Sequence, residues 1–335
     1  MRLHAALLAP IILLVASSPA PGQNTEGKRP LYSKPLQMPL RGDDFRLPLS
    51  IVADLNAAEV FVCDPLNHRI AIFDRNGLFK FEIRGGMSFR SPIDLAVNPE
   101  GYLFVLATHQ GHQSVVRLDF DGRFLEAFEL QGIPESSGGQ NFRSIAISSQ
   151  AERLYIADQW QHKLWITDLD GKVTGAFDFE EGRTEEEIEN LLLGRVDVYG
   201  ESVLMGVPSE GFVYRFDLAG NLEQKIGQKG ATPCMLGMPV AAALDELDRV
   251  VILDQQRALF QVWQAEDNTC LHEYYGFGAQ PGALNRPFDL ALDLDGQVFI
   301  TQGYEGRVQM YRGGEPAAFQ GPSDGKDQVE TPPQD

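Results

Sequence analysis

The sequence predicts an all-β fold, a six-bladed β-propeller of four-stranded antiparallel blades. Short apolar strands recur along the chain, and successive copies end near Asp64, Ala107, Asp158, Val207, Asp254 and Gln302. These positions lie 43 to 51 residues apart, a period typical of propeller blades with several strands each. Asp-x-x-Gly turns repeat at nearly the same spacing, starting at Asp74, Asp119, Asp168 and Asp217. The turns fix the register, and a closed ring accommodates 335 residues in one domain.

The chain is expected to divide into four segments: a signal peptide (1–22), an N-terminal extension (23–44), the propeller (45–319) and a disordered acidic tail (320–335). The apolar run 5–16 follows Arg2 and precedes small residues, as in a secretory signal. It is shorter than the roughly 20 residues that a membrane span requires. Export to the periplasm, the cell surface or the medium is therefore expected.

Composition restricts the partners. The formal charge of −19 disfavours nucleic acid and anionic lipid surfaces, and favours basic proteins or cations. Of the three cysteines, Cys63 lies in an apolar strand and is expected to be a buried thiol. Cys234 and Cys270 flank the fifth repeat, and whether they pair is left open. The chain has no Cys-x-x-Cys-His run, so no covalent haem is expected.

Each unit is read as four strands, a to d, from the centre of the ring outward. In the second unit these strands are expected over 93–97, 102–106, 114–118 and 123–128. The turn between a and b holds Asn98 and Gly101, which favour a tight turn. The sixth unit lacks a good strand d. Either residues 316–319 or the N-terminal segment 31–40 fills that place, and the N-terminal segment is preferred.

One helix is expected outside the repeat, near 184–193. Thr184 and Glu187 form a capping box, in which each side chain can satisfy the other residue's amide. Ile188, Leu191 and Leu192 then fall on one helical face. A packed linker before the fourth blade is the preferred interpretation, and a docking element is the alternative.

These residues resemble the NHL-repeat six-bladed β-propellers of the secreted bacterial type. The repeat is clearest as Pro48, then Val62-Cys63-Asp64, then Asn67-His68-Arg69-Ile70, and returns as Ile156-Ala157-Asp158 and Ile252-Leu253-Asp254. The likeness covers about 45–312 and is poorest in the fourth unit, which lacks the proline and the acidic residue. It implies a recognition platform, because many NHL propellers bind partners through one face.

The candidate site lies on the propeller axis. The third positions of the six a strands are Ser50, Asp94, Ser144, Arg195, Ala241 and Asp289. Asp94, Arg195 and Asp289 should meet at the tunnel mouth, on the face carrying the d–a and b–c loops. A structural plug is the preferred interpretation, since half-buried charges need partners. A small-ligand or cation site with Ser50 and Ser144 is the alternative, with Asp94 and Asp289 as weak calcium ligands.

Other polar residues are assigned mainly to the repeat. His68 and His162 occupy equivalent turns and are interpreted as turn residues, whereas His109 and His112 are candidate partner contacts. Trp165 should be core and Trp160 an exposed partner contact. Three aspartates are expected to hold the b–c turns through hydrogen bonds or ion pairs, the latter with Arg69 or Lys163 five residues on: Asp64, Asp158 and Asp254.

The preferred function is a secreted, non-catalytic platform that binds another exported or cell-surface protein, or a small ligand, through the d–a and b–c face. No cofactor is expected, apart from calcium as an alternative. The competing function is an enzyme, either a calcium-dependent lactonase or esterase, or a lyase like the zinc-dependent peptidyl-amidoglycolate lyase. No inner strand carries the histidines that such a zinc site implies.

Overall fold

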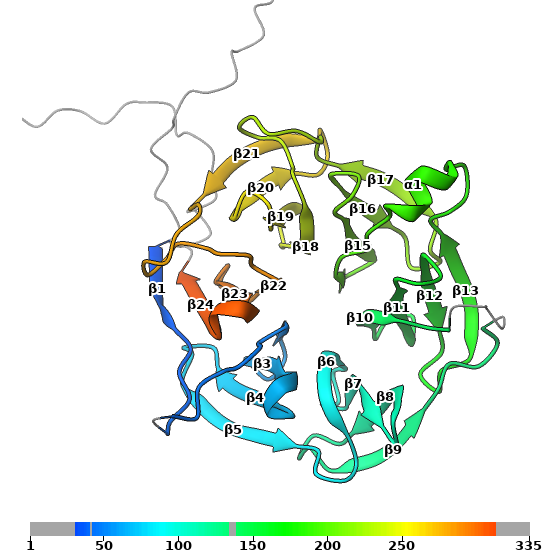
Figure 1. Ribbon diagram of the computed structural model, residues 1–335, viewed down its shortest axis with the longest axis vertical. Coiled ribbons are helices and arrows are strands. Elements are labelled where there is room, and N and C mark those ends of the chain that lie inside the picture. Colours follow the sequence, from blue (N-terminus) through cyan, green and yellow to red (C-terminus); the bar gives the residue numbers. More distant parts are fainter. Residues whose placement is uncertain (1–30, 41, 134–138, 313–335) are drawn as a thin grey trace, which may run out of the picture.

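A computed structural model describes residues 31–40, 42–133 and 139–312 of the chain. Six four-stranded sheets stand around a central axis, each with its strand a innermost (Figure 1). The predicted six-bladed all-β architecture is confirmed. The predicted signal peptide and acidic tail lie outside the described residues. No helix among the described residues is long and apolar enough to cross a membrane.

The strands follow the predicted units. Blades one to three contain β2 (Ser50–Asp54), β3 (Glu59–Asp64), β4 (Arg69–Asp74), β5 (Phe79–Arg84), β6 (Arg90–Val97), β7 (Leu103–His109), β8 (His112–Leu118), β9 (Phe124–Phe128), β10 (Phe142–Ser148), β11 (Arg153–Asp158), β12 (Lys163–Thr167) and β13 (Val173–Asp178). Blades four and five contain β14 (Val196–Tyr199), β15 (Ser202–Val207), β16 (Phe212–Phe216), β17 (Leu222–Ile226), β18 (Pro239–Leu244), β19 (Arg249–Asp254), β20 (Leu259–Gln264) and β21 (Thr269–Tyr274). The fourth unit, the poorest sequence match, forms a regular blade.

The sixth blade is completed from the N-terminus. It contains β22 (Asp289–Leu292), β23 (Val298–Gln302) and β24 (Arg307–Arg312), and its outer strand is β1 (Leu31–Pro35), antiparallel to β24. Leu36, which follows β1, is buried against the first and sixth blades. The alternative closing segment, 316–319, lies outside the described residues.

Turn chemistry sets the blade register. In the turn after β4, the Oδ1 atom of Asp74 accepts hydrogen bonds from the amides of Asn76 and Leu78, at 2.8 and 2.9 Å. Gly77 completes the turn with φ of 73°, a backbone region that favours glycine. The turns beginning at Asp119, Asp168 and Asp217 repeat this arrangement.

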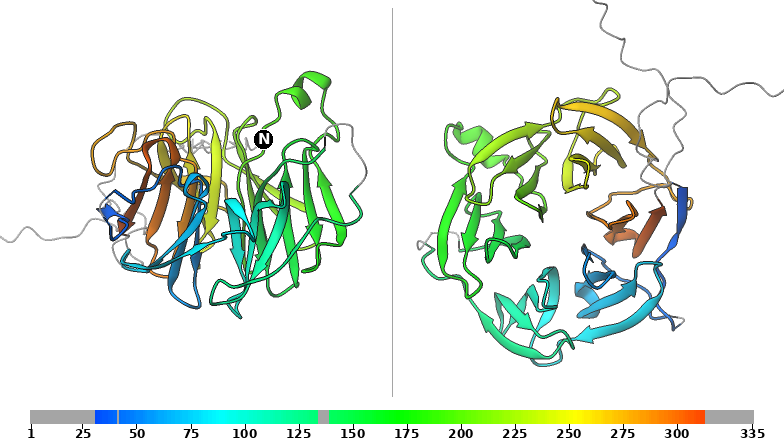
Figure 2. Two further views of the ribbon diagram at one scale, coloured as in Figure 1. Left: turned by 60° about the horizontal axis from the view of Figure 1, so that its bottom comes forward. Right: turned by 180° about the vertical axis from the view of Figure 1, so that it is seen from behind.

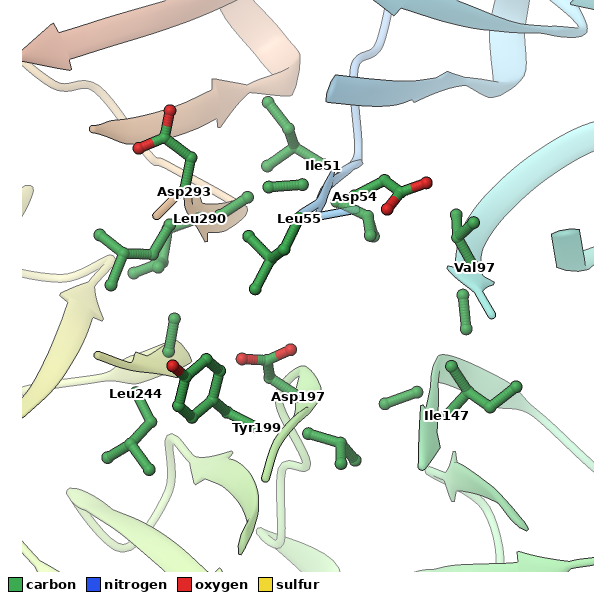
Figure 3. A pocket seen from close by; sticks show the side chains of 18 of the residues that line it. Ile51, Asp54, Leu55, Val97, Ile147, Asp197, Tyr199, Leu244, Leu290 and Asp293 are labelled. Carbon is green, nitrogen blue, oxygen red and sulfur yellow. The ribbon is translucent and has the colours of Figure 1, made fainter. Parts of the chain in front are cut away.

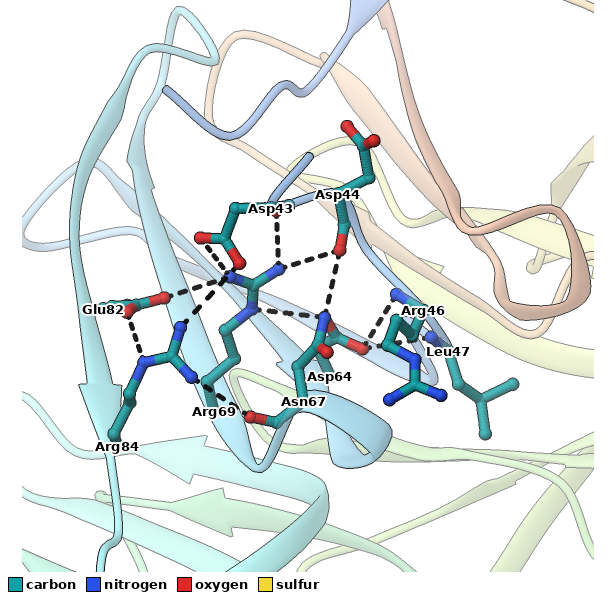
Figure 4. Close-up of polar contacts among 9 residues, drawn as sticks. All are labelled: Asp43, Asp44, Arg46, Leu47, Asp64, Asn67, Arg69, Glu82 and Arg84. Carbon is teal, nitrogen blue, oxygen red and sulfur yellow. Dashed lines mark hydrogen bonds and ion pairs between the residues drawn. The ribbon is translucent and has the colours of Figure 1, made fainter. Parts of the chain in front are cut away.

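The buried aspartates that end strand b hold the loops of the opposite face. Asp64 accepts hydrogen bonds from the amides of Arg46 and Leu47, and its other oxygen lies 3.2 Å from Nε of the fully buried Arg69 (Figure 4). The matching ion pair is absent in the third blade. Lys163 pairs with Asp178 on the outer strand β13, while Asp158 accepts from backbone amides and from Trp165.

The predicted capping box is present. Thr184 and Glu187 exchange hydrogen bonds at the start of α1 (Glu185–Glu189), which stands on one face of the ring (Figure 2). The helix ends before Leu191, so the expected helical face does not continue. Leu191 is buried, but Leu192 is exposed, contrary to its predicted position on the packed face.

Cys234 and Cys270 form a disulfide with a Cα–Cα distance of 5.6 Å, within the usual range. It ties the loop before the fifth blade to that blade's outer strand β21. Cys63 is the buried free thiol that the sequence predicts. Burial raises its pKa well above the usual value, which disfavours the thiolate form.

Candidate functional site

Strand pairing shows that the inner-strand residues are equivalent. Ser50, Asp94 and Ser144 pair with Cys63, Leu106 and Ala157, the residues just before Asp64, Ala107 and Asp158 in the repeat. Ala241 and Asp289 pair likewise. Arg195 precedes β14, and its carbonyl accepts a hydrogen bond from Gly206 at the matching position. The sequence alignment therefore placed all six residues at one level.

Asp94 collects donors from three blades. Its Oδ1 atom accepts from the Ser50 hydroxyl and, at 2.9 Å, from the Leu95 amide. Its Oδ2 atom accepts from the Ser144 hydroxyl at 2.6 Å and from the Ile145 amide at 2.9 Å. Four donors on one buried carboxylate offset its loss of hydration.

Arg195 spans the axis between the two aspartates. Its Nη1 lies 3.4 Å from Oδ2 of Asp94, and its Nε lies 3.9 Å from Oδ2 of Asp289. The guanidinium also donates to the carbonyls of Leu49 and Arg143, at 2.9 and 2.8 Å. Its side chain is only 14% exposed, so this charge is largely shielded from solvent.

Asp289 has fewer hydrogen-bond donors than Asp94. It accepts from the amides of Ile51 and Leu290, at 3.0 and 2.9 Å. Burial raises its pKa, Arg195 opposes that rise and Asp94 adds to it. The arrangement matches the structural plug, because the cluster and the Arg195 amide, which donates to Val240, join all six blades.

The axial cavity lies on the other side of this cluster from the predicted mouth. It has a volume of about 320 Å³ and is lined by the inner strands and by the a–b turns, including Leu55, Tyr199 and Asp293 (Figure 3). Asp94, Ser144 and Asp289 form its closed end. The cavity therefore opens on the a–b face. At the d–a and b–c end of the axis, the predicted mouth is closed by Arg195, which donates to the carbonyls of Leu49 and Arg143.

The alignment did not single out Asp197, although it lines the same cavity. It lies two positions after Arg195, where the other five blades carry Val52, Ala96, Ala146, Ala243 and Ala291. Burial raises the pKa of the Asp197 carboxyl to about 6, although the Val198 amide lowers it; the charge of Asp94 adds to the rise. Extending the alignment by two residues would have exposed this outlier.

The predicted calcium candidates lack a ligand cage. Asp94 and Asp289 face the same guanidinium, and across 31–40, 42–133 and 139–312 no group of three or more His, Cys, Asp or Glu residues is arranged to hold a metal. Calcium sites usually take six to eight oxygen ligands. The carboxylates of these two aspartates are therefore engaged by Arg195 within the axial cluster.

The histidines separate as the repeat predicts. His68 and His162 both have left-handed backbones, with φ of 51° and 46°, at the same position of their b–c turns. His109 stacks on Phe124, and its Nδ1 lies 2.5 Å from the Ser88 carbonyl. His112 pairs with His109 across the hairpin and is exposed. Trp160 is exposed and Trp165 buried, both as expected.

Comparison with known proteins supports the fold. A structural genomics protein of unknown function from Bacteroides thetaiotaomicron VPI-5482 superposes with a TM-score of 0.60 at 16% identity, covering 82% of this chain and 71% of that one. Kuenenia stuttgartiensis hydrazine synthase gives a TM-score of 0.52 at 12% identity, covering 82% of this chain and 97% of that one. Neither a scan against protein-family models nor a search of curated proteins found a match. These likenesses show a shared propeller fold.

Proposed function

We propose that this chain is an exported, non-enzymatic binding protein that docks onto another protein through its d–a and b–c face. The supporting observation is a set of exposed apolar side chains at one position of three b–c turns. Leu66, Trp160 and Tyr304 each lie two residues after the end of strand b and are 49%, 58% and 69% exposed. Phe277, in the loop before the sixth blade, is also exposed.

Buried residues at the ends of three b strands anchor the loops of this face. Asp64, Asp158 and Gln302 are fully buried and accept hydrogen bonds from amides of the neighbouring d–a loops. Asp158 also accepts from the amide of Trp160 in its own b–c turn. Aromatic residues on rigid supports provide large contact areas at a small entropic cost, and Trp and Tyr are enriched among the residues that dominate binding energy. With a formal charge of −19, the favoured partner is a basic protein.

Export is supported by two features. The N-terminal segment has the pattern of a secretory signal. The Cys234–Cys270 disulfide suits an oxidising compartment, since such bonds are rare in reducing cytosol.

No observation favours the enzymatic alternatives. A calcium-dependent hydrolase needs free carboxylate oxygens on the axis, and those of Asp94 and Asp289 are engaged by amides, hydroxyls and Arg195. The lyase alternative needs histidines on the inner strands, and the six equivalent positions carry none.

The test compares two aromatic variants that differ in the face they alter. Partners are captured from the exported fraction by the wild type, by Trp160→Ala/Tyr304→Ala, and by Phe120→Ala. Phe120 is 67% exposed in a c–d turn on the opposite face. A protein retained by wild type and Phe120→Ala, with affinity reduced about tenfold or more in the double variant, supports the proposal. Equal binding to all three contradicts it.

A further inference from the structure

The axial cavity has the charge of a cation site. Among the described residues that line it, eight carry carboxylates and one carries a guanidinium. That guanidinium, on Arg249, is paired with Asp245 at 2.6 Å. Arg195 engages the two aspartates at the closed end. A cleft lined by one sign of charge between low-dielectric walls concentrates ions of the opposite sign, so the cavity attracts cations.

Asp197 places a carboxylate inside the cavity, in addition to the acidic residues of the a–b turns around its opening. It projects toward the axis from the fourth blade (Figure 3), two residues further along the inner strand than Arg195. Within the described residues, no arginine or lysine forms an ion pair with it. Asp197 is half-buried, and a carboxylate that has lost part of its water without gaining a counter-charge is unfavourable.

The remaining walls are suited to an organic ligand. Leu55 and Leu290 lie around the axis near Asp197 (Figure 3), and Val52 also lines the cavity. Tyr199 ends β14, where the a–b turn begins. A volume of about 320 Å³ lies at the small end of ligand pockets. A bare metal ion would leave these apolar walls without a contact. No three metal-ligating side chains converge here in the described chain.

We propose that the axial cavity binds a small organic amine, whose ammonium group pairs with Asp197 while its apolar body contacts the walls near Leu55 and Leu290. The site is on the opposite face from the proposed protein-docking surface and does not depend on it. The ammonium supplies the counter-charge that Asp197 lacks. The carboxylates of the a–b turns around the opening, among them Asp54, Asp293 and Asp295, attract the ammonium group toward the cavity.

The test uses isothermal titration of the protein expressed from its full-length sequence. The probes are n-hexylamine, the neutral isostere 1-hexanol, and calcium chloride. The variants are Asp197→Ala and the matched control Asp170→Ala, which removes the same charge from an exposed c–d turn. Asp197→Ala should fold, because four blades already carry alanine at this position.

The expected result is saturable hexylamine binding to the wild type and to Asp170→Ala. The affinity of Asp197→Ala for hexylamine should be at least about tenfold lower than that of the wild type. The affinity of the wild type for hexanol should be lower than its affinity for hexylamine by a similar factor. Three results would overturn the proposal: no hexylamine binding by wild type, equal binding by Asp197→Ala, or equal binding of hexanol. Asp197-dependent calcium binding without amine binding would also overturn it in favour of a metal site.

Discussion

At the residue scale, charge placement distinguishes the two buried carboxylates of the plug, Asp94 and Asp289, from the half-buried carboxylate of Asp197. Asp94 and Asp289 are held by hydroxyls, amides and one guanidinium, so their charge is largely compensated inside the protein. Asp197 has only the Val198 amide to lower its pKa. The first pair therefore behaves as structure, whereas Asp197 has the character of a site.

Replacing Arg195 tests the plug. Arg195→Met should lower the free energy of unfolding by about 3–5 kcal/mol at pH 8, since it leaves two buried carboxylates without their cation. The loss should be smaller at pH 5, where protonation removes part of the uncompensated charge. Urea unfolding at both pH values measures this, with the exposed Arg46→Met as control. A loss below about 1 kcal/mol at pH 8 would contradict a structural role.

The raised pKa of Asp197 predicts a pH-dependent stability. Its folded pKa of about 6 lies above the ordinary value of 3.8. The stability linked to this group is therefore fully present below about pH 4 and is lost as the pH rises through 6. At pH 7, the free energy of unfolding of Asp197→Ala should exceed that of the wild type by at most about 3 kcal/mol. The difference should shrink toward pH 4. Urea unfolding of both proteins between pH 4 and pH 7 measures this difference. If the difference does not change with pH, the pKa of Asp197 is not raised.

At the element scale, β1 decides whether the ring is closed. It covers the edge of β24, and the Tyr32 amide donates to the Tyr275 hydroxyl, 243 positions along the chain. An uncovered strand edge is a template for pairing with another chain. The first strand of the described chain thus protects the last one.

Removing β1 should open that edge. A chain lacking residues 1–40 is expected to melt at a lower temperature and to associate as its concentration rises, because the backbone groups of β24 are left unpaired. A chain lacking only residues 1–30 keeps β1 and should match the full-length protein. Light scattering and thermal unfolding compare the two truncations. Identical behaviour would mean that β1 contributes nothing to closure.

At the scale of the whole molecule, the sequence repeats were enough to predict the fold but not all of the candidate site. The Asp-x-x-Gly turns fixed the register because their local hydrogen bonds need no tertiary context, and the meeting of Asp94 with Arg195 followed from that register. The direction of the cavity did not follow, since it depends on which end of the axis the Arg195 side chain fills. Likewise, Lys163 forms its ion pair with Asp178 and not with Asp158. This depends on packing, which the spacing of the residues in the sequence does not reveal.

Closure by β1 also imposes an order on folding. A chain made from its N-terminus presents β1 first, but the partner of β1 is the last strand of the ring. Blades one to five can form from neighbouring segments, while the sixth must wait until β24 has been made. Contacts between distant segments slow folding. Late truncations should therefore leave an open ring with an unpaired first strand, a natural target for quality-control proteases and chaperones.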